Sequence, residues 1–145
     1  ARNSPIFERS LPGLDRDGVS IAQLRCKTVY IKFGTTWCPL CLAGLEDFAA
    51  LAEQAASSPD ITVISIVTPG LNGEVPKEDF IAWARAQRIS FPIYFDESGT
   101  VTREFGIRAY PTAAYLTANG AVMKIIVGDE SNAQIMGELN TIKGR

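Results

Sequence analysis

Apolar runs alternate with helical periodicities along the first half of the chain. Residues 28–33 (TVYIKF) and 61–67 (ITVISIV) are nearly continuous apolar runs, rich in β-branched and aromatic residues. Such runs are typical of strands buried on both faces of a parallel or mixed sheet. Between them, from Pro39 until Pro59 ends the pattern, helical spacing is kept by Leu42, Leu45, Phe48, Leu51, Ala52 and Ala55. The order strand, helix, strand predicts a βαβ unit with a right-handed crossover.

The alternation continues after the loop at residues 68–73. Pro76 opens a predicted helix with a buried stripe made by Phe80, Ile81, Trp83 and Ala84. A short strand at 91–95 follows, and a brief helix at 101–105 then ends at Gly106, which suits a left-handed cap.

The last part of the chain has a hairpin pattern. Residues 112–117 and 121–127 are strand-like and are joined through Asn119-Gly120, a strong turn signal. Ser131 can cap a final helix whose apolar positions are Ile135, Met136, Leu139 and Ile142. The whole pattern predicts an α/β fold with a mixed sheet, parallel early and closed by an antiparallel hairpin.

Length and charge limit the classes of function. With 145 residues and 46% hydrophobic composition, we expect one domain over residues 1–145 with a real core. Fourteen basic and sixteen acidic residues, without a basic cluster, argue against nucleic acid as a partner. No apolar run approaches the roughly 20 residues of a membrane span. Because the chain starts without Met, we expect a mature form or a piece of a longer chain, from which an export signal or membrane anchor is missing.

The segment 1–27 precedes the first predicted strand and contains Pro5, Pro12, Gly13 and Gly18. We interpret it as an N-terminal extension. Flexible decoration is favoured over a packed lead or hairpin.

Two cysteines in Trp37-Cys38-Pro39-Leu40-Cys41 carry the candidate chemistry. A structural bridge between such near neighbours would constrain the unfolded chain very little. Zinc needs about four ligands, and the chain has three cysteines and no histidine, so no metal is predicted. The pair therefore predicts dithiol/disulfide exchange without any cofactor besides a redox-active Cys38–Cys41 disulfide.

The start of a helix assigns the two thiols different roles. Cys38 falls where free backbone N–H groups and the helix dipole favour a thiolate, so it is predicted as the nucleophile. Pro39 suits the first helical position, because its missing N–H costs nothing there. Cys41 lies a turn further in and is expected to be the less exposed, resolving thiol. Pro39-Leu40 supplies no imidazole to stabilise the thiolate, which favours a reductant.

Phe33 to Cys41 (FGTTWCPLC), Gly106 to Thr112 (GIRAYPT), Asn119-Gly120 and Val127-Gly128 resemble the thioredoxin family in order and spacing. The likeness spans residues 28–142. The segment 68–95 resembles the inserted strand and helix of the TlpA/ResA-like branch, which works outside the cytoplasm. More narrowly, IKF, WCPLC, the TPG of residues 68–70 and the YP of 110–111 resemble the N-terminal domains of PilB-type methionine sulfoxide reductase fusions. The resemblance implies a thioredoxin fold with a TlpA-like insertion.

The resemblance also implies roles around the cysteines. Trp37 would shield the disulfide and help to dock clients, although packing against its own loop is the alternative. Pro111 would be the family's cis-proline, placing Tyr110 beside the cysteines to pair with an extended substrate peptide.

In two places the chain departs from these relatives. Relatives have acidic residues at the positions of Lys32 and Gly44. The resemblance therefore does not indicate which group accepts the proton of Cys41. We expect the Lys32 side chain to snorkel to the end of the sheet. The alternative is that its positive charge favours the Cys41 thiolate. Glu46 lies two residues after Gly44, some 200° away around the helix. We expect it to be a solvated surface residue rather than a substitute for the missing acid.

Cys26 stands apart from the motif, just before the first predicted strand. It is expected to be a buried or idle thiol rather than a redox group. The loop 68–75 is either a simple connection or a segment near the active site.

Together these points predict a monomeric, extracytoplasmic protein disulfide reductase. By resemblance its client is a methionine sulfoxide reductase or another periplasmic thiol protein, and its electrons come from a membrane DsbD-like donor. A cytochrome c maturation reductase of the CcmG/ResA type is the alternative within the class. A non-catalytic thioredoxin-like interaction module is the alternative from another class.

Overall fold

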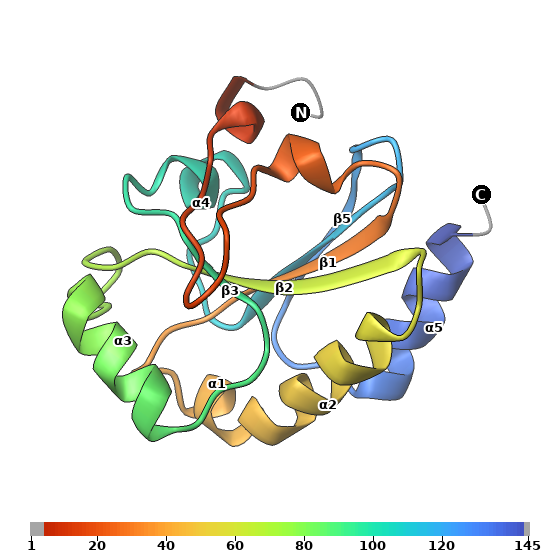
Figure 1. Cartoon of the computed structure of the whole chain (residues 1–145). Helices are drawn as coiled ribbons and strands as arrows, with labels where there is room; N and C mark the ends of the chain where they lie inside the picture. Colours follow the sequence, from red (N-terminus) through yellow and green to blue (C-terminus); the bar gives the residue numbers. More distant parts are fainter. Residues whose placement is uncertain (1–4, 144–145) are drawn as a thin grey trace.

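The computed structural model describes residues 5–143, within which the strands form one sheet in the order β3-β2-β1-β4-β5 (Figure 1). The strands are β1 (Thr28–Phe33), β2 (Ile61–Val67), β3 (Ile93–Phe95), β4 (Thr112–Leu116) and β5 (Val122–Val127). β1 pairs parallel with β2, and β2 with β3, whereas β4 is antiparallel to β1 and to β5. The mixed sheet with its closing hairpin is thus confirmed, and β3 starts two residues later than predicted.

Helices cover both faces of this sheet (Figure 1). The α-helices are α1 (Pro39–Ala43), α2 (Leu45–Ala56), α3 (Lys77–Ala86), α4 (Thr100–Glu104) and α5 (Asn132–Lys143), and two 3-10 turns are η1 (Pro5–Glu8) and η2 (Ile21–Leu24). Phe48 and Leu51 of α2 and Leu139 of α5 pack on one face of the sheet. Phe7 of η1, Ile21 of η2 and Val101 of α4 pack on the other.

The helix predicted from Pro39 onward is interrupted at Gly44, which has φ −94° and ψ 4° and separates α1 from α2. Leu42, which shares the apolar spacing of α2 in the sequence, belongs to α1 and is 40% exposed. The prediction for Pro76 needs a smaller correction, since it is the residue before α3 rather than its first residue.

The N-terminal extension is packed, so the expectation of flexible decoration is wrong for the described part; residues 1–4 lie outside it. Phe7 is buried and its ring stacks on Phe105 at 5.3 Å between centroids. Leu11 and Val19 exchange two backbone hydrogen bonds of 2.7 and 3.0 Å, which makes the segment a hairpin. The scattered apolar side chains of the extension close one face of the sheet, which is why it holds a fixed place.

Successive side chains of β1 point to opposite faces of the sheet, and this decides which of them lie near the site. Val29, Ile31 and Phe33 point to the face covered by η1, η2 and α4. Tyr30 packs against the α2 side, and Lys32 lies on that side too, because side chains two apart share a face of a strand. The chain then leaves β1 at Phe33 and reaches Cys38 through a short loop.

Candidate active site

Cys38 and Cys41 flank the first turn of α1. Cys38 is the residue before the helix, with extended backbone (φ −83°, ψ 115°), and its Sγ accepts the backbone N–H of Cys41 at 3.2 Å. Pro39 occupies the first helical position, where a missing N–H leaves no partner unsatisfied. Both thiols are free, so the structure describes the dithiol form.

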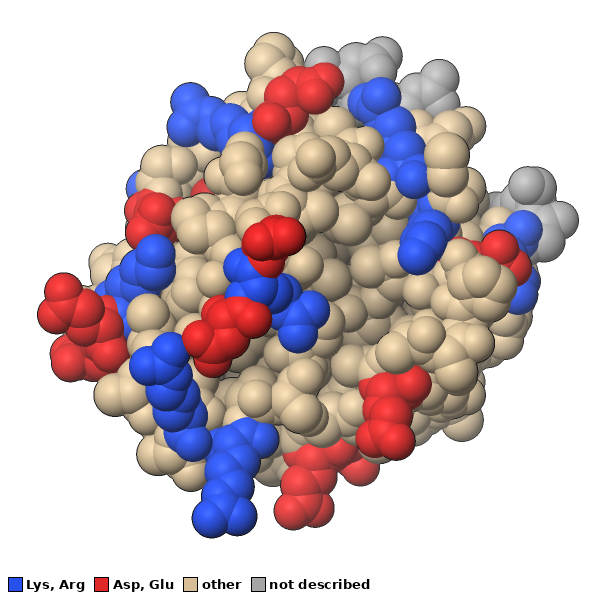
Figure 2. Space-filling model, viewed as in Figure 1, with Lys and Arg blue, Asp and Glu red and all other residues tan. Residues whose placement is uncertain are grey.

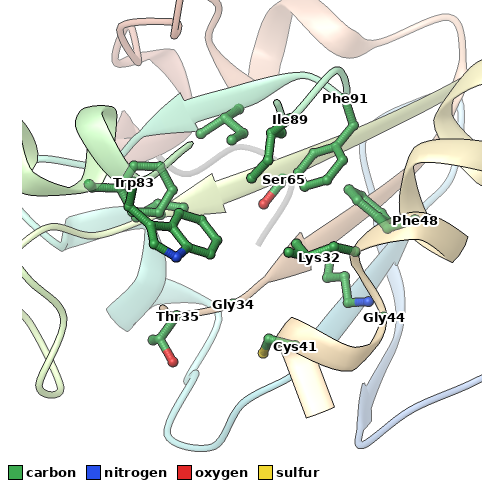
Figure 3. Close-up of a pocket in the computed structure, with 14 residues that line it drawn as sticks. Lys32, Gly34, Thr35, Cys41, Gly44, Phe48, Ser65, Trp83, Ile89 and Phe91 are labelled. Carbon is green, nitrogen blue, oxygen red and sulfur yellow. The ribbon is translucent and has the colours of Figure 1, made fainter. Parts of the chain in front are cut away.

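The expected difference in exposure between the thiols is reversed. Cys38 is 2% exposed and Cys41 is 8% exposed. Cys41 lines a pocket formed by β1, β2, β3, α2 and α3, whereas Cys38 does not. Figure 3 shows this pocket, with Cys41 and Lys32 on one side, the contacting rings of Phe48 and Phe91 at one end, and Trp83 at the other.

Burial raises the pKa of the Cys41 thiol to about 12, and a hydrogen bond between the two thiols acts in the same direction. A backbone hydrogen bond from Thr35 and the positive charge of Lys32 act in the opposite direction. The neutral thiol is therefore the resting form of Cys41 at physiological pH. Any nucleophilic attack by Cys41 needs this proton to leave.

Lys32 also lines this pocket, and its amine lies beside Gly44, at the junction of α1 and α2 (Figure 3). Its Nζ lies 5.0 Å from the centroid of the Phe48 ring. A Cβ added at Gly44 would lie 3.7 Å from that Nζ, so the absence of a side chain at Gly44 leaves room for the amine. Glu46 is exposed and is not part of the pocket lining, in agreement with its expected place on the surface.

An aromatic and polar rim surrounds the cysteines. Trp37 and Leu40 are each 51% exposed. The indole N–H of Trp37 donates to the carbonyl oxygen of Asn72 at 3.0 Å, and the Asn72 amide donates to the Tyr110 hydroxyl at 2.8 Å. The rings of Trp37 and Tyr110 meet edge to face, 5.9 Å apart. The peptide bond between Tyr110 and Pro111 is cis, as the resemblance implied.

Sequence reasoning missed Glu74, which is 5% exposed. Its carboxylate accepts hydrogen bonds from the N–H and hydroxyl of Thr36 and from the N–H of Val75. With Asn72 on the same loop, Glu74 anchors the segment 68–75 to the loop before Cys38. This loop is therefore part of the site's surroundings and not only a connection.

Cys26 is exposed, so of the expected buried or idle thiol the buried form is wrong, while an idle thiol stays a prediction. It has φ +79°, and its N–H donates to the carbonyl oxygen of Ala118 at 2.6 Å. It precedes β1, whereas the CxxC pair follows the other end of that strand. The structure therefore does not bring Cys26 to the other two thiols.

The described residues do not meet the requirements of a metal site or of a membrane-spanning helix. Within residues 5–143, no cluster of three or more His, Cys, Asp or Glu side chains could hold a metal ion. On the face in Figure 2, basic and acidic side chains are interspersed rather than gathered by sign. Among the described helices, none has the length and apolar character needed to cross a membrane.

A CxxC pair at a helix start, a cis-proline after a tyrosine that meets Trp37, and a mixed sheet covered by helices together define the thioredoxin-like redox proteins. The Redoxin family profile matches residues 2–140, and the chain belongs to this family. Its fold is the thioredoxin fold, and its activity is that of a thiol-disulfide oxidoreductase, a class that needs no cofactor and acts on oxidised thiol proteins.

Named relatives are consistent with this class. The sporulation thiol-disulfide oxidoreductase A of Bacillus subtilis is 29% identical over 84% of this chain and 72% of its own length. The exposed lipoprotein thioredoxin Etrx1 of Streptococcus pneumoniae has a TM-score of 0.86 at 31% identity, covering 92% of this chain and 98% of the other. The N-terminal domain of PilB from Neisseria gonorrhoeae has a TM-score of 0.78 at 26% identity, covering 97% and 96%.

Proposed function

We propose that this chain is an extracytoplasmic protein disulfide reductase that regenerates a methionine sulfoxide reductase. The Cys38 thiolate attacks the client's disulfide, a mixed disulfide forms, and Cys41 resolves it to release the reduced client. The client's disulfide arises when its catalytic cysteine reduces methionine sulfoxide. A membrane donor of the DsbD type would reduce the Cys38–Cys41 disulfide again.

The position of Cys38 before α1 carries the assignment of the nucleophile. Its sulfur meets the backbone N–H of Cys41 at 3.2 Å and the positive end of the helix, and both favour negative charge on sulfur. Trp37, Leu40 and Tyr110 offer apolar and hydrogen-bonding surface near it. By resemblance, Pro111 would lie where an extended client peptide pairs. This combination of thiols and docking surface argues against a non-catalytic interaction module.

The proposed location and the proposed client are supported by the relatives of this chain. Etrx1 is described as an exposed lipoprotein, which supports a place outside the cytoplasm. The match to the N-terminal domain of PilB supports a methionine sulfoxide reductase as the client. We further propose that residues 1–145 act as one unit, since the extension packs against the core of the sheet.

The reduction potential tests the direction of electron flow. Equilibration with glutathione should give a value more negative than about −180 mV, the value for protein disulfide isomerase. A value near the −120 mV or so of DsbA contradicts the assignment as a reductant.

Trapping identifies the client. Cys41→Ser leaves Cys38 without a resolving partner, so a mixed disulfide should accumulate with an oxidised methionine sulfoxide reductase. Cys38→Ser is the matched control and should trap nothing. If Cys38→Ser traps the client and Cys41→Ser does not, the assigned roles of the two thiols are wrong.

A cytochrome c maturation reductase remains the second candidate, favoured by relatives named thiol-disulfide oxidoreductase ResA. The ResA of Geobacillus thermodenitrificans is 28% identical over 85% of this chain. Reduction of oxidised apocytochrome c and of oxidised methionine sulfoxide reductase can be compared under one set of conditions. The larger kcat/KM decides between the two clients.

A further inference from the structure

The proton on Cys41 is the obstacle in the resolving step, and the structure shows what faces it. Cys41 lines a pocket whose walls come from β1, β2, β3, α2 and α3. Most of the lining is apolar, including Phe48, Phe80, Trp83 and Phe91. A thiolate formed there has little water to stabilise it, and burial raises the pKa of Cys41 more than the positive charge of Lys32 lowers it.

Lys32 is the one charged residue in the lining of this pocket, which consists entirely of described residues. β2 contributes Ser65 and Val67, β3 contributes Ile93, and α2 contributes Leu45 and Phe48, so none of these elements presents a carboxylate. Glu74, the nearest buried acid of the neighbouring loop, uses its oxygens on Thr36 and Val75. Apart from Lys32, the titratable group facing Cys41 is Cys38.

Among residues 5–143, no acidic side chain neutralises the ammonium of Lys32. Within residues 5–143 its charge forms no ion pair, and its recorded contact is with the face of the Phe48 ring. Ser65 is its neighbour across the β1–β2 pair and carries no charge. The bare backbone at Gly44 leaves space for the amine beside the first turn of α2. The positive charge thus remains available to a negative group in the pocket.

We propose that Lys32 is a positioning residue for the resolving step, holding a positive charge that stabilises the Cys41 thiolate in place of a carboxylate proton acceptor. The inference rests on the proposed function of the dithiol. Cys41 gives its proton to water, and its thiolate attacks the Cys38 sulfur of the mixed disulfide. The Cys38–client bond breaks as the Cys38–Cys41 bond forms. The client sulfur leaves with the electron pair of the broken bond and takes up a proton, so the client is reduced and Cys41 is oxidised.

Alkylation of Cys41 tests this charge without any client. In a Cys26→Ser, Cys38→Ser background Cys41 is the remaining thiol, and its reaction with iodoacetamide between pH 7 and 9 follows the fraction of thiolate. Lys32→Met should slow alkylation at least about threefold at each pH, equivalent to half a pKa unit. Lys32→Arg keeps the charge and should retain most of the rate. Lys32→Gln serves as a second neutral variant should Lys32→Met not fold.

Lys124 offers a matched control. It is also a strand lysine, with its Nζ 5.6 Å from the centroid of the Tyr115 ring, but it pairs with Glu138 and is not in the Cys41 pocket. Lys124→Met should leave the alkylation rate unchanged. Neutral variants at Lys32 that match the parent rate would overturn the proposal. So would an Arg variant that loses as much as the neutral ones, since that result indicates a packing role.

Resolution itself can be followed in the Cys26→Ser protein with an aromatic disulfide that forms a mixed disulfide on Cys38. Attack by Cys41 releases the second coloured thiolate, and Lys32→Met should shift the pH profile of this release upward. An unchanged profile contradicts the proposal. Because neither assay uses a protein client, a failure to reduce methionine sulfoxide reductase would leave this inference standing and would count only against the assigned client.

Discussion

Glu74 and Thr36 are 38 residues apart in sequence, yet both carboxylate oxygens of Glu74 are held by Thr36. One accepts the backbone N–H at 2.9 Å, and the other accepts the hydroxyl. Because Thr36 precedes Trp37 and Cys38, this pair fixes the entry to the CxxC turn from a loop outside the βαβ unit. The arrangement couples the inserted segment to the geometry of the site.

Glu74→Ala should therefore destabilise the protein. The change removes the acceptor for the Thr36 N–H and hydroxyl and for the Val75 N–H in a buried position, and leaving such groups unpaired costs about 1–3 kcal/mol. Urea unfolding measures the loss. Glu53→Ala, at an exposed position of α2, is the control and should change the free energy of unfolding by less than about 0.5 kcal/mol. Equal effects of the two variants would show that the buried contacts contribute nothing.

Two glycines of the same loop allow the position of Trp37 to be tested. Gly70 and Gly73 both have positive φ, +76° and +83°, so alanine at either carries a backbone cost of about 1–2 kcal/mol. A Cβ at Gly73 would also lie 3.3 Å from the indole nitrogen of Trp37, whereas a Cβ at Gly70 meets nothing within 4 Å. Gly73→Ala should thus destabilise more than Gly70→Ala and should also slow client reduction.

Fluorescence separates these two effects. In a Trp83→Phe background the emission comes from Trp37, and Gly73→Ala should shift it while Gly70→Ala leaves it in place. If both variants shift the emission equally, the contact between Gly73 and Trp37 does not position the indole.

The elements that sequence patterns predicted well are those set by neighbours along the chain. β1 and β2 match the two continuous apolar runs residue for residue, and the hairpin follows from Asn119-Gly120. Ser131 was predicted as a cap, and its hydroxyl accepts the N–H of Gln134 at 3.1 Å. Local turn chemistry and burial decide such features, so a short window of sequence is enough.

Features set by distant partners were not predictable. An acidic residue in a Gly-rich loop is solvated by default, and nothing near Glu74 in the sequence indicates Thr36 as its partner. Phe7 likewise finds Phe105 across the molecule, so an extension with several Pro and Gly residues gave no sign of packing. The break at Gly44 is not visible in the sequence, because the apolar spacing of α2 extends back to Leu42. The sequence shows Lys32 as the one charge of its strand, but its proximity to Gly44 follows from the fold.

The free energy of unfolding should fall as pH rises from about 9 to 12, because the pKa of Cys41 is raised in the folded protein. Its pKa is about 12 in the folded protein and near 9.0 for an ordinary thiol, so between pH 9 and 12 the unfolded chain has lost this proton while the folded protein keeps it. The unfolded state then binds fewer protons, and the free energy of unfolding falls with rising pH, by up to about 1.4 kcal/mol per unit. Below pH 9 this contribution is fully present.

Comparison of Cys26→Ser with Cys26→Ser, Cys41→Ser isolates the effect. The second protein should show a flatter decline between pH 9 and 10. Above pH 10 ordinary tyrosines begin to titrate, and burial raises the pKa of both Tyr30 and Tyr115, so they add a decline of the same sign. Parallel curves for the two proteins between pH 9 and 10 would contradict the raised pKa of Cys41.

Thr35, next to the Cys41 pocket, carries a hydroxyl that should be dispensable. The residue is 6% exposed, and its Oγ1 has no hydrogen-bond partner among residues 5–143. Thr35→Val keeps the branched shape and removes an unpaired polar atom, so it should raise the free energy of unfolding by about 1 kcal/mol. Thr112→Val is the matched opposite, because that buried hydroxyl donates to the carbonyl oxygen of Ala109 at 2.7 Å and its loss should destabilise. Urea unfolding of both variants gives the comparison. A loss of stability in Thr35→Val as large as in Thr112→Val would mean that the Thr35 hydroxyl has a hydrogen-bond partner. The expected gain would show that this wall of the pocket tolerates an entirely apolar side chain beside Cys41.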